Sequence, residues 1–410
     1  METSIVKTYL ETPEGQEAEK ILRACVHCGF CTATCPTYQI LGDELDGPRG
    51  RIYLIKQVLE GKIPTHRTQQ HLDRCLTCRS CETTCPSGVQ YGRLADIGRE
   101  IVEGKVRRPL TERLKRLGLR KLLPYPSRFA FLLTLGRAAS IFMPDHLRRK
   151  LPSIQSRTIR PETVHKRRML VLEGCAQQAA TPNTNAATAR LLHRLGISLI
   201  SEPKSGCCGA VSHHLSAQDE SRLAMRRNID AWWPHIEAGA EAIVITASGC
   251  GAMVKEYGHL MRHDPAYADK AATVSSLARD IGEILTQEDL TPLSIQGGGR
   301  PIAFHSPCTL QHGQKLSGVV EAILQRLDYK LTPVADSHLC CGSAGTYSLL
   351  QSELSQQLLT QKLSSLTGGK PELIATANIG CQLHLASQSE IPVQHWIELL
   401  DEAMQKNHRK

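Results

Sequence analysis

Two short cysteine runs decide how the N-terminal part of this chain folds. They read Cys25-Val-His-Cys-Gly-Phe-Cys-Thr-Ala-Thr-Cys-Pro36 and Cys75-Leu-Thr-Cys-Arg-Ser-Cys-Glu-Thr-Thr-Cys-Pro86. Both have the spacing C-x₂-C-x₂-C-x₃-C-P, in which three thiolates wrap one corner of an iron–sulfur cube and the fourth cysteine reaches the other cube. The spacing therefore predicts two [4Fe–4S] clusters with crossed ligands.

The crossed pattern defines two sites of four cysteines each. The first site comprises Cys25, Cys28, Cys31 and Cys85. The second site comprises Cys35, Cys75, Cys78 and Cys81. A pair of zinc sites or a disulfide framework is the alternative interpretation. Zinc usually takes two pairs of ligands rather than a tight run of four, so two independent runs of this spacing favour iron–sulfur ligation.

Length and cysteine usage bound the class of protein. A chain of 410 residues is long enough for two or three domains. All 16 cysteines fall in motif-like groups, which indicates metal binding in a reducing compartment rather than a secreted disulfide scaffold. Residues 1–10 lack the apolar core of a secretory signal. Because no apolar run approaches the ~20 residues of a spanning helix, we expect a soluble or surface-bound protein.

The formal charge of +9 is concentrated in one segment of the chain. Residues 105–168 contain 18 Lys and Arg against three acidic residues, so the remainder of the chain carries a net charge of about −6. Helices are expected over 110–123 and 127–142. Apolar side chains gather there, at Phe129, Phe131, Leu132, Leu133, Leu135, Ile141, Phe142 and Met143.

Two interpretations of this basic segment remain open. A basic helix with an apolar face can rest on an anionic membrane or contact a partner. Alternatively, a linker packs its apolar side on a neighbouring domain and leaves its cations solvated, which the pattern slightly favours. We expect no nucleic-acid binding, because the segment lacks interleaved aromatic residues and any known binding module.

The remaining pattern divides the chain into four regions. Residues 1–104 are expected to form a small helical two-[4Fe–4S] ferredoxin-type domain, with helices at 18–24, 52–60, 66–73 and 94–103 and a turn at 46–51. Residues 105–166 are the basic linker. Strands then alternate with helices, which is typical of α/β lobes with parallel sheets, over residues 167–296 and 297–410. The expected strands are 168–173, 197–200, 242–246, 301–305, 330–334 and 373–376.

The two C-terminal lobes are an internal repeat. The interval from Cys175 to Cys207 equals that from Cys308 to Cys340, and an offset of 133 residues relates the two pairs. A search for internal periods thus indicates duplicated halves. The motif cysteines follow predicted strands, and ligands in such folds bind at the carboxyl ends of strands.

Each lobe supplies four cysteines. The first lobe has Cys175, Cys207, Cys208 and Cys250, and the second lobe has Cys308, Cys340, Cys341 and Cys381. Adjacent cysteines fit different irons of a cluster better than one metal ion, so one or two further iron–sulfur clusters are candidates here. The alternative is buried structural cysteine. Four histidines lie near the second set, as proton donors or as hydrogen-bonding groups: His305, His312, His338 and His384.

The C…CCG…C halves resemble the cysteine-rich CCG domains of the heterodisulfide reductase family. Joined to a two-cluster ferredoxin module, they resemble the iron–sulfur subunits of membrane-associated flavin dehydrogenases, and among these the glycolate oxidase iron–sulfur subunits. The stretches that carry the resemblance are Arg23–Cys31, Gly42–Arg51, Thr246–Gly251 and His338–Thr346. It covers nearly the whole chain.

The resemblance implies an oxidoreductase complex that oxidises glycolate to glyoxylate with an acceptor other than NAD or oxygen. This chain would only transfer electrons, from flavin (FAD) subunits toward a quinone or another membrane acceptor, and would itself contain no catalytic residue. Such a complex would lie peripherally on the cytoplasmic face of the inner membrane. No flavin or nicotinamide site is legible in the sequence, which agrees with the redox cofactor being on another chain.

One departure from the resemblance concerns the last cysteine of each half. In heterodisulfide reductases it belongs to a C-x-x-C pair, whereas here the earlier position is Ala247 or Asn378. Four thiols remain per half, so disulfide reduction in the lobes is less expected. The alternatives are an equivalent subunit of a lactate or glycerol-3-phosphate dehydrogenase complex, and a heterodisulfide-reductase-like subunit with catalysis in the lobes.

Overall fold

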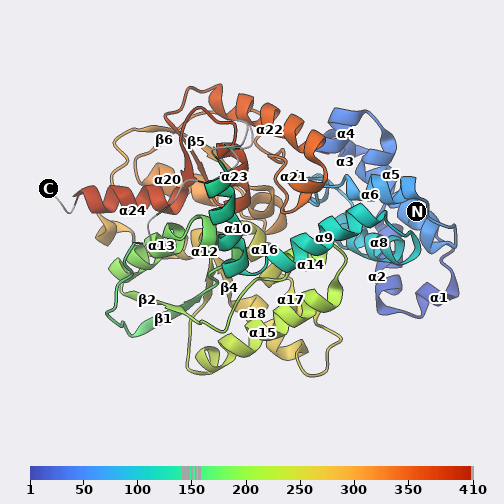
Figure 1. Cartoon of the computed structure of the whole chain (residues 1–410), viewed down its shortest axis with the longest axis horizontal. Helices are drawn as coiled ribbons and strands as arrows, with labels where there is room; N and C mark the ends of the chain where they lie inside the picture. The colour runs from blue at the N-terminus through green and yellow to red at the C-terminus, as the bar shows by residue number, and fades with distance from the viewer. Residues whose placement is uncertain (141–147, 149–150, 153–154, 156–157, 408–410) are drawn as a thin grey trace. The chain divides into compact units, whose positions relative to one another are not determined.

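The computed structural model describes residues 1–140, 148, 151–152, 155 and 158–407, and the chain forms two compact units (Figure 1). The first unit comprises Met1–Gly118, His214–Ser216 and His338–Lys362. The second unit comprises Leu119–His213, Ala217–Ser337 and Leu363–Lys410. Part of the second C-terminal half therefore groups with the N-terminal module.

The N-terminal module is helical, as the sequence predicts. Its helices are α1 (Lys7–Leu10), α2 (Pro13–Ala24), α3 (Phe30–Ala33), α4 (Pro36–Leu41), η1 (Glu44–Asp46), α5 (Pro48–Leu59), α6 (His66–Asp73), α7 (Ser80–Thr83) and α8 (Tyr91–Lys105). The later segments of the same unit contribute α21 (Tyr347–Leu350) and the first part of α22 (Ser352–Thr367).

Two helices begin earlier than the sequence analysis expected, each at a proline. Pro13 starts α2, ahead of the expected start at 18, and Pro48 starts α5, so residues 48–51 of the expected turn are helical. Proline fits the first helical position because that position needs no intrahelical N–H donor. The Thr12 hydroxyl caps α2 by accepting the Gly15 N–H at 3.1 Å.

The core of this unit lies between α2, α5, α6 and α8. Leu22, Ile55, Leu59 and Leu94 have no exposed surface. Gly98 lets α8 approach α5 closely, because a Cβ at that position would lie 2.5 Å from Ile55 Cγ1. The cysteine runs lie in the loops and short helices that connect these four helices.

The second unit contains two four-stranded sheets, each parallel throughout. The sheet orders are β2-β1-β3-β4 and β6-β5-β7-β8. The strands are β1 (Arg167–Val171), β2 (Ile197–Ser201), β3 (Ile243–Ile245), β4 (Ala278–Asp280), β5 (Pro301–His305), β6 (Lys330–Leu331), β7 (Leu373–Thr376) and β8 (Val393–His395). The predicted α/β class with two related parallel-sheet lobes is confirmed.

Three of the four edge strands, β4, β6 and β8, are where the sequence prediction was wrong, whereas the edge strand β2 was predicted to within one residue. Strands β4 and β8 were not predicted, and β6 is two residues long where five were expected. These edge strands are short and contain polar residues, whereas the central strands are continuous buried apolar runs. An apolar-run criterion therefore finds the central strands and β2 but misses β4 and β8.

The helices of the second unit make two equivalent contacts between the lobes. The helices are α12 (Cys175–Ala180), α13 (Asn183–Arg194), α14 (Ala210–His214), α15 (Gln218–Glu237), α16 (Ser248–Lys255), α17 (Tyr257–Leu260), α18 (Ala268–Leu277), α19 (Ile281–Gln287), η3 (Thr291–Leu293), η4 (Thr309–Gly313), α20 (Val319–Arg326), α23 (Ile379–Ala386) and α24 (Trp396–Asn407). Helix α24 of the second lobe packs on α13 of the first, and α19 of the first packs on α20 of the second.

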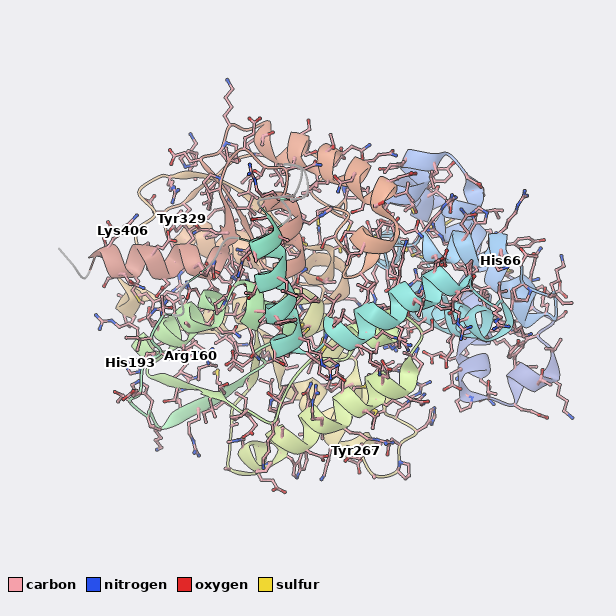
Figure 2. All side chains as sticks on the ribbon, viewed as in Figure 1. His66, Arg160, His193, Tyr267, Tyr329 and Lys406 are labelled. Carbon is pink, nitrogen blue, oxygen red and sulfur yellow. The ribbon has the colours of Figure 1, made fainter. Side chains whose placement is uncertain are left out.

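These two equivalent contacts close one shared core. Ile197, Leu324 and Trp396, from three different strands and helices, belong to it and have at most 1% of their surface exposed. Arg190 on α13 pairs with Asp401 on α24 at 2.6 Å. Glu173, just after β1, pairs at 2.5 Å with Arg160, which is labelled in Figure 2. The parts of the two halves that lie in the second unit thus form one packed body with a shared core.

The basic segment forms two helices, α9 (Leu110–Leu122) and α10 (Pro126–Ala139). Leu133 is buried, but Leu114 is 58% exposed and Phe131 is 63% exposed. A linker that packs its apolar side would bury these side chains. Ile141, Phe142 and Met143, which the sequence analysis included in the apolar group, lie outside the described residues. None of the helices in the described ranges is both long and apolar enough to cross a membrane.

The close approach of α8 and α5 predicts opposite effects for two glycine substitutions in one helix. Gly98→Ala should lower the free energy of unfolding by about 1–3 kcal/mol, because the new methyl group overlaps the buried Ile55. Gly104→Ala should raise it by up to about 1 kcal/mol, because alanine favours helix and a Cβ there meets nothing within 4 Å. Urea unfolding of the full chain, followed by circular dichroism, measures both. Equal midpoints for the two variants would contradict the packing described.

Candidate metal centres

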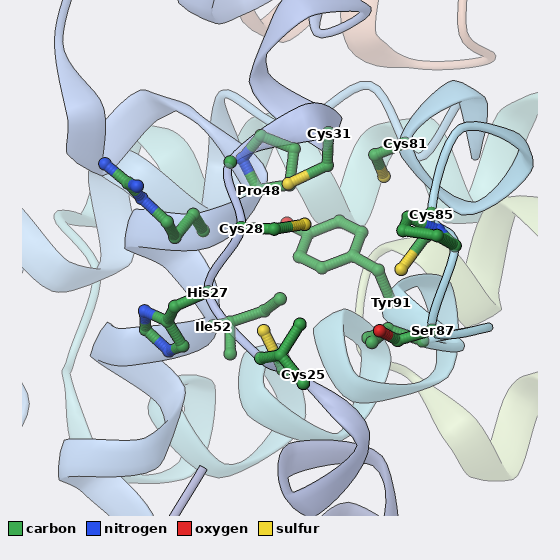
Figure 3. A pocket seen from close by; sticks show the side chains of 15 residues that line it. Cys25, His27, Cys28, Cys31, Pro48, Ile52, Cys81, Cys85, Ser87 and Tyr91 are labelled. Atoms are coloured by element: carbon green, nitrogen blue, oxygen red, sulfur yellow. The ribbon is translucent and has the colours of Figure 1, made fainter.

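The four cysteines of the first predicted site line one cavity. Cys25, Cys28, Cys31 and Cys85 surround it, together with Tyr91 and Pro48. Figure 3 shows Cys25 and Cys85, which are 60 residues apart in sequence, on opposite sides of this space. Cys25 is buried and Cys28 is exposed, so the site lies at the edge of the module.

The four cysteines of the second predicted site line a separate cavity. Cys35, Cys75, Cys78 and Cys81 surround it. Pro48, Tyr91 and Cys81 line both cavities. The two cavities therefore adjoin, and the fourth cysteine of each run lies in the cavity of the other run. This is the arrangement that the crossed pattern predicts, although the ligand assignment itself stays a prediction.

The loops of both runs use the same backbone conformation. His27 and Thr77 occupy the position before the second cysteine, and both have positive φ, 58° and 53°. Gly29 and Arg79 occupy the position after it, with φ of 85° and 60°. Left-handed residues turn neighbouring N–H groups into a concave anion-binding nest, and the Thr77 N–H donates to Cys75 Sγ at 3.4 Å.

The thiols of each site act on one another electrostatically. Burial, followed by the neighbouring Cys25, raises the pKa of Cys31 to about 11, and the other two thiols of that site add to the effect. Burial also raises the pKa of Cys81, with Cys78, Cys75 and Cys35 contributing. Thiols this close compete for ionisation until a cation binds them as thiolates. The donor set and its crowding therefore fit a cluster with four thiolate ligands in each cavity.

Sequence reasoning missed a buried arginine between the runs. Arg51 is 1% exposed and Asp46 is fully buried. The Arg51 Nε donates to the His71 carbonyl at 2.7 Å, and its other nitrogens lie 3.2 Å from Thr37 Oγ1. Asp46 accepts from Arg74 at 2.8 Å. The sequence signal for this arginine is the Gly-Pro-Arg-Gly-Arg stretch at residues 47–51, which the sequence analysis interpreted as a turn.

Two arginines, Arg51 and Arg99, place positive charge near the second site. Although burial alone would raise it, Arg51 and then Arg99 lower the pKa of Cys75 below its ordinary value. Arg99 donates to the Cys75 carbonyl at 2.6 Å and to Thr77 Oγ1 at 2.8 Å. Both cations favour thiolate at Cys75 and would stabilise extra negative charge on a group bound there.

The first lobe brings its four cysteines together within the second unit. Cys175 follows β1, the adjacent pair Cys207 and Cys208 follows β2, and Cys250 lies in α16 after β3. These strands are neighbours in the order β2-β1-β3. Hydrogen bonds from the Cys175 and Cys208 thiols lower the pKa of Cys207, so both of these thiols lie next to that of Cys207.

The loop after the paired cysteines is built in the same way in both halves. Gly209 and Gly342 have φ of 91° and 89°, and their N–H groups donate to the sulfur of Cys207 at 3.5 Å and of Cys340 at 3.4 Å. A Cβ at Gly342 would lie 2.6 Å from the Ser355 carbonyl oxygen. The glycine of the CCG motif is therefore required by both its conformation and its close packing.

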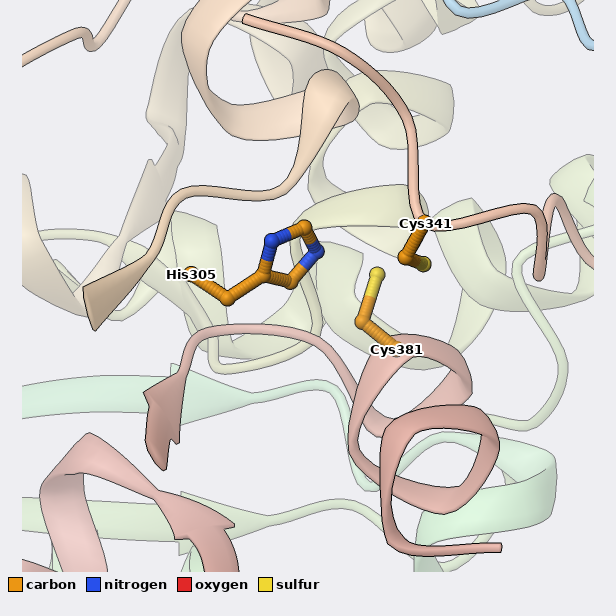
Figure 4. Close-up of side chains that lie close together, drawn as sticks. All are labelled: His305, Cys341 and Cys381. Atoms are coloured by element: carbon orange, nitrogen blue, oxygen red, sulfur yellow. The ribbon is translucent and has the colours of Figure 1, made fainter. Parts of the chain in front are cut away.

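The cysteines of the second half are divided between the two compact units. Cys308 and Cys381 follow the neighbouring strands β5 and β7 in the second unit, whereas the adjacent pair Cys340 and Cys341 belongs to the first unit. A nitrogen of the His305 ring lies within 4.8 Å of the Cys381 sulfur (Figure 4). Of the four histidines singled out in the sequence, His305 is thus placed as a neighbour of a motif cysteine.

Asn378 occupies the position of the missing fifth cysteine and makes specific contacts. Its Nδ2 donates to Cys381 Sγ at 3.5 Å, and its Oδ1 accepts the Gly249 N–H at 3.4 Å. Ser248 Oγ and Thr309 Oγ1 are 2.7 Å apart. The loops that carry Cys250, Cys308 and Cys381 therefore adjoin across the interface between the lobes. Sequence reasoning recorded Asn378 only as a lost thiol.

Family models match both parts of the chain. A 4Fe-4S dicluster domain matches residues 21–89, and a cysteine-rich domain, CCG, matches residues 169–255 and 302–386. The match at 21–89 includes both cysteine runs.

Curated relatives match over most of the length. The glycolate oxidase iron-sulfur subunit of Escherichia coli is 59% identical over 408 residues, which cover 99% of this chain and 100% of the relative. The probable glycolate oxidase iron-sulfur subunit of Bacillus subtilis is 30% identical and covers 88% of this chain and 87% of the relative. Lactate utilization protein A of Bacillus licheniformis is 28% identical over 55% of this chain and 96% of its own length.

A solved structure shares the fold. The crystal structure of a hypothetical protein from Helicobacter pylori aligns with a TM-score of 0.57 at 11% identity, covering 97% of this chain and 73% of that one. At this identity the likeness concerns the fold alone.

Crossed ligation predicts which site each fourth cysteine supports. Cys85→Ser should damage the first site, although Cys85 belongs to the second run, and Cys35→Ser should damage the second site. Electron paramagnetic resonance of the dithionite-reduced chain, with iron counted on the same samples, distinguishes the two signals. Each variant serves as the control for the other. Loss of the second signal alone in Cys85→Ser would show that each run ligates its own cluster.

Proposed function

The chain belongs to the family of glycolate oxidase iron–sulfur subunits, and we propose that it carries electrons from glycolate oxidation to glyoxylate toward the quinone pool. Two adjoining cavities, each lined by four cysteines of the predicted crossed set, are the observation that carries this proposal. It is a subunit of an oxidoreductase complex, and its own part in the reaction is electron transfer.

The residues of the chain hold and tune the redox groups. A [4Fe–4S] cluster accepts and donates one electron at a time. Cys25, Cys28, Cys31 and Cys85 hold one, and Cys35, Cys75, Cys78 and Cys81 hold the other. Arg51 and Arg99 place positive charge beside Cys75, so the second site is the more favourable place for an added electron.

The oxidation itself belongs to partner subunits that carry flavin, as FAD. Oxidising an alcohol carbon to a carbonyl removes two electrons and two protons, which requires a carrier that takes an electron pair. An iron–sulfur group held by the thiols would take only one electron at a time. Val26 and Phe30 flank the exposed Cys28 and are 66% and 61% exposed. This apolar surface beside the first site suits the docking of such a subunit.

The lobes are candidates for one or two further iron–sulfur groups. The four converging thiols of the first lobe, Cys175, Cys207, Cys208 and Cys250, support one of them. The second lobe would use Cys308, Cys340, Cys341 and Cys381. In both halves the N–H of the CCG glycine donates to the sulfur of the first cysteine of the pair.

The basic helices α9 and α10 support a peripheral position of the complex on the cytoplasmic face of the inner membrane. From that position the complex would pass its electrons to a quinone rather than to NAD or oxygen. On α9, exposed Leu110, Leu114 and Leu117 recur at helical spacing, and basic residues flank them. Such a helix binds an anionic lipid surface through both its apolar face and its charge.

A second candidate is the equivalent subunit of a lactate-oxidising complex, which the match to lactate utilization proteins favours. Complexes for glycerol 3-phosphate, or for a heterodisulfide reduced in the lobes, are tested by the same assay. Ala247 and Asn378 stand where a heterodisulfide reductase has its fifth cysteine, which counts against the last of these.

The substrate is tested with the complex purified anaerobically together with its partner subunits. Glycolate should reduce a dye and should bleach the iron–sulfur absorbance of this chain, whereas lactate and glycerol 3-phosphate should do so at least several-fold more slowly. Omitting this chain should leave flavin reduction intact and abolish electron delivery to quinone. Faster reduction by lactate, or disulfide reduction by the isolated chain, would overturn the assignment.

Membrane association is tested with the same complex and phosphatidylglycerol vesicles. Binding should weaken as salt rises. Leu114→Gln combined with Phe131→Gln should weaken it at least about tenfold, because each such side chain contributes about 1.5–3 kcal/mol when fully buried and a tenfold change needs only about 1.4 kcal/mol. Leu223→Gln, at an equally exposed position on α15, is the matched control. Equal binding to neutral vesicles, or no effect of the double variant, would contradict this position.

A further inference from the structure

The first lobe contains a polar cavity, and among the described residues that line it none is a motif cysteine. Its volume is about 410 Å³, within the roughly 300–1,000 Å³ that small-molecule sites usually have. It lies where Glu173 follows β1 and Ser201 ends β2. These are the carboxyl ends of neighbouring parallel strands, where such sheets bind ligands. All of its lining residues belong to the second compact unit.

Buried hydrogen bonds fix one wall of this cavity. Gln177 and Asn185 are 3% and 2% exposed. The Gln177 Nε2 donates to Asn185 Oδ1 at 3.0 Å and to Thr246 Oγ1 at 2.6 Å. The Asn185 Nδ2 in turn donates to Glu173 Oε2 at 3.0 Å. The polar groups of this wall are therefore held in place before a ligand arrives, which lowers the entropy cost of binding.

The internal repeat shows that the fold does not require these polar side chains. The offset of 133 residues relates positions in the first half to equivalent positions in the second half. There Gln177 is replaced by Leu310, which has no exposed surface. The other replacements are Ser306 for Glu173, Gly318 for Asn185 and Ala335 for Glu202. Two halves with equivalent sheets thus differ in this polar set, which points to a role in binding rather than in folding.

Three charged side chains line the cavity, those of Arg160, Glu173 and Glu202. Arg160 pairs with Glu173 through both terminal nitrogens, at 2.5 Å and 2.8 Å. A guanidinium has five N–H groups, so this pair uses only part of its capacity to donate. The Arg160 side chain is 32% exposed, and the N–H groups that Glu173 does not use suit a carboxylate.

Glu202 supplies the second carboxylate of the cavity. Its Oε1 accepts the Lys204 N–H at 3.0 Å, and its Oε2 pairs with His235 Nε2 at 2.9 Å. The hydrogen bond from His235, followed by that from the Lys204 N–H, lowers the pKa of Glu202. The group is therefore ionised at neutral pH. Each carboxylate oxygen can accept a second hydrogen bond, so Glu202 can also take a donor from a ligand.

The balance of charge selects the class of ligand. The three charged side chains sum to −1, because Glu173 and Glu202 outweigh Arg160. A simple anion would meet two carboxylates, and a simple cation would offer Arg160 no acceptor. A molecule with one carboxylate and one ammonium group matches both kinds of partner. We propose that this cavity binds a free amino acid, with its carboxylate on Arg160 and its ammonium group on Glu202.

This site is separate from the oxidation that the complex performs. The amino acid is bound and released unchanged, so it is an effector and not a substrate. Gln177 comes two residues after Cys175, and Ser205 comes two residues before Cys207. Both residues line the cavity, so an occupied cavity lies beside the loops that carry two thiols of the first lobe.

Equilibrium dialysis of the full chain with radiolabelled glycine, the smallest amino acid, tests the proposal. Glycine should bind saturably, at one site per chain. Acetate keeps only the carboxylate and methylamine keeps only the ammonium group. Each should therefore compete at least about tenfold less tightly than unlabelled glycine, because one set of charge-assisted hydrogen bonds is lost. Failure of glycine to saturate, or equally tight competition by acetate or methylamine, would overturn the proposal.

Substitutions show whether glycine binds in this cavity. Glu202→Gln should weaken its binding at least about tenfold, and Gln178→Leu, which changes no charge, should also weaken it by removing a polar lining group. Glu372→Gln is the matched control and should bind glycine normally, since Glu372 pairs with Arg300 at 3.2 Å in the second lobe. Circular dichroism checks that the variants fold. Unchanged affinity in Glu202→Gln, or in Gln178→Leu where Glu202→Gln does not fold, would overturn the proposal, as would an equal loss in the control.

Discussion

The buried ion pair of Arg51 and Asp46 is the interaction on which the N-terminal module depends. Arg51 spans from Thr37, just after the first cysteine run, to the His71 carbonyl on the helix that leads into the second run. Asp46 holds the same helix through His71 at 3.0 Å and Arg74. Removing one partner of a buried pair typically costs about 3–5 kcal/mol. Crossed cysteine sites need the two runs in one fixed register, and this pair supplies it.

The same cation has a second effect, on the chemistry of the site. Burial lowers the pKa of Arg51, but Cys75, Tyr91, Cys35 and Asp46 together raise it above its ordinary value, so Arg51 stays charged although it is buried. A group held by these thiols gains negative charge when it is reduced, and a desolvated cation nearby stabilises that charge far more than one in water. Arg51, which sets the register of the two runs, thus also makes reduction at the second site more favourable.

The parts that could be predicted from the sequence were those with rigid spacing rules. The C-x₂-C-x₂-C-x₃-C-P runs predicted which cysteines share a cavity, because thiolate reach limits the loop length. Repeated cysteine intervals predicted two parallel-sheet lobes. Arg51 and Asn378 escaped prediction because their roles come from contacts distant in sequence. The edge strands β4 and β8 lack an apolar run, and only backbone pairing with β3 and β7 defines them.

The central claim is that this chain is an electron carrier built on two crossed four-thiol sites. Its most direct test is to count iron and sulfide in the anaerobically purified chain and to record its electron paramagnetic resonance after reduction. We expect at least about eight irons per chain, from two four-iron clusters, and two reduced signals that interact because the cavities adjoin. Zinc in place of iron, or a single isolated signal with about four irons, would contradict it.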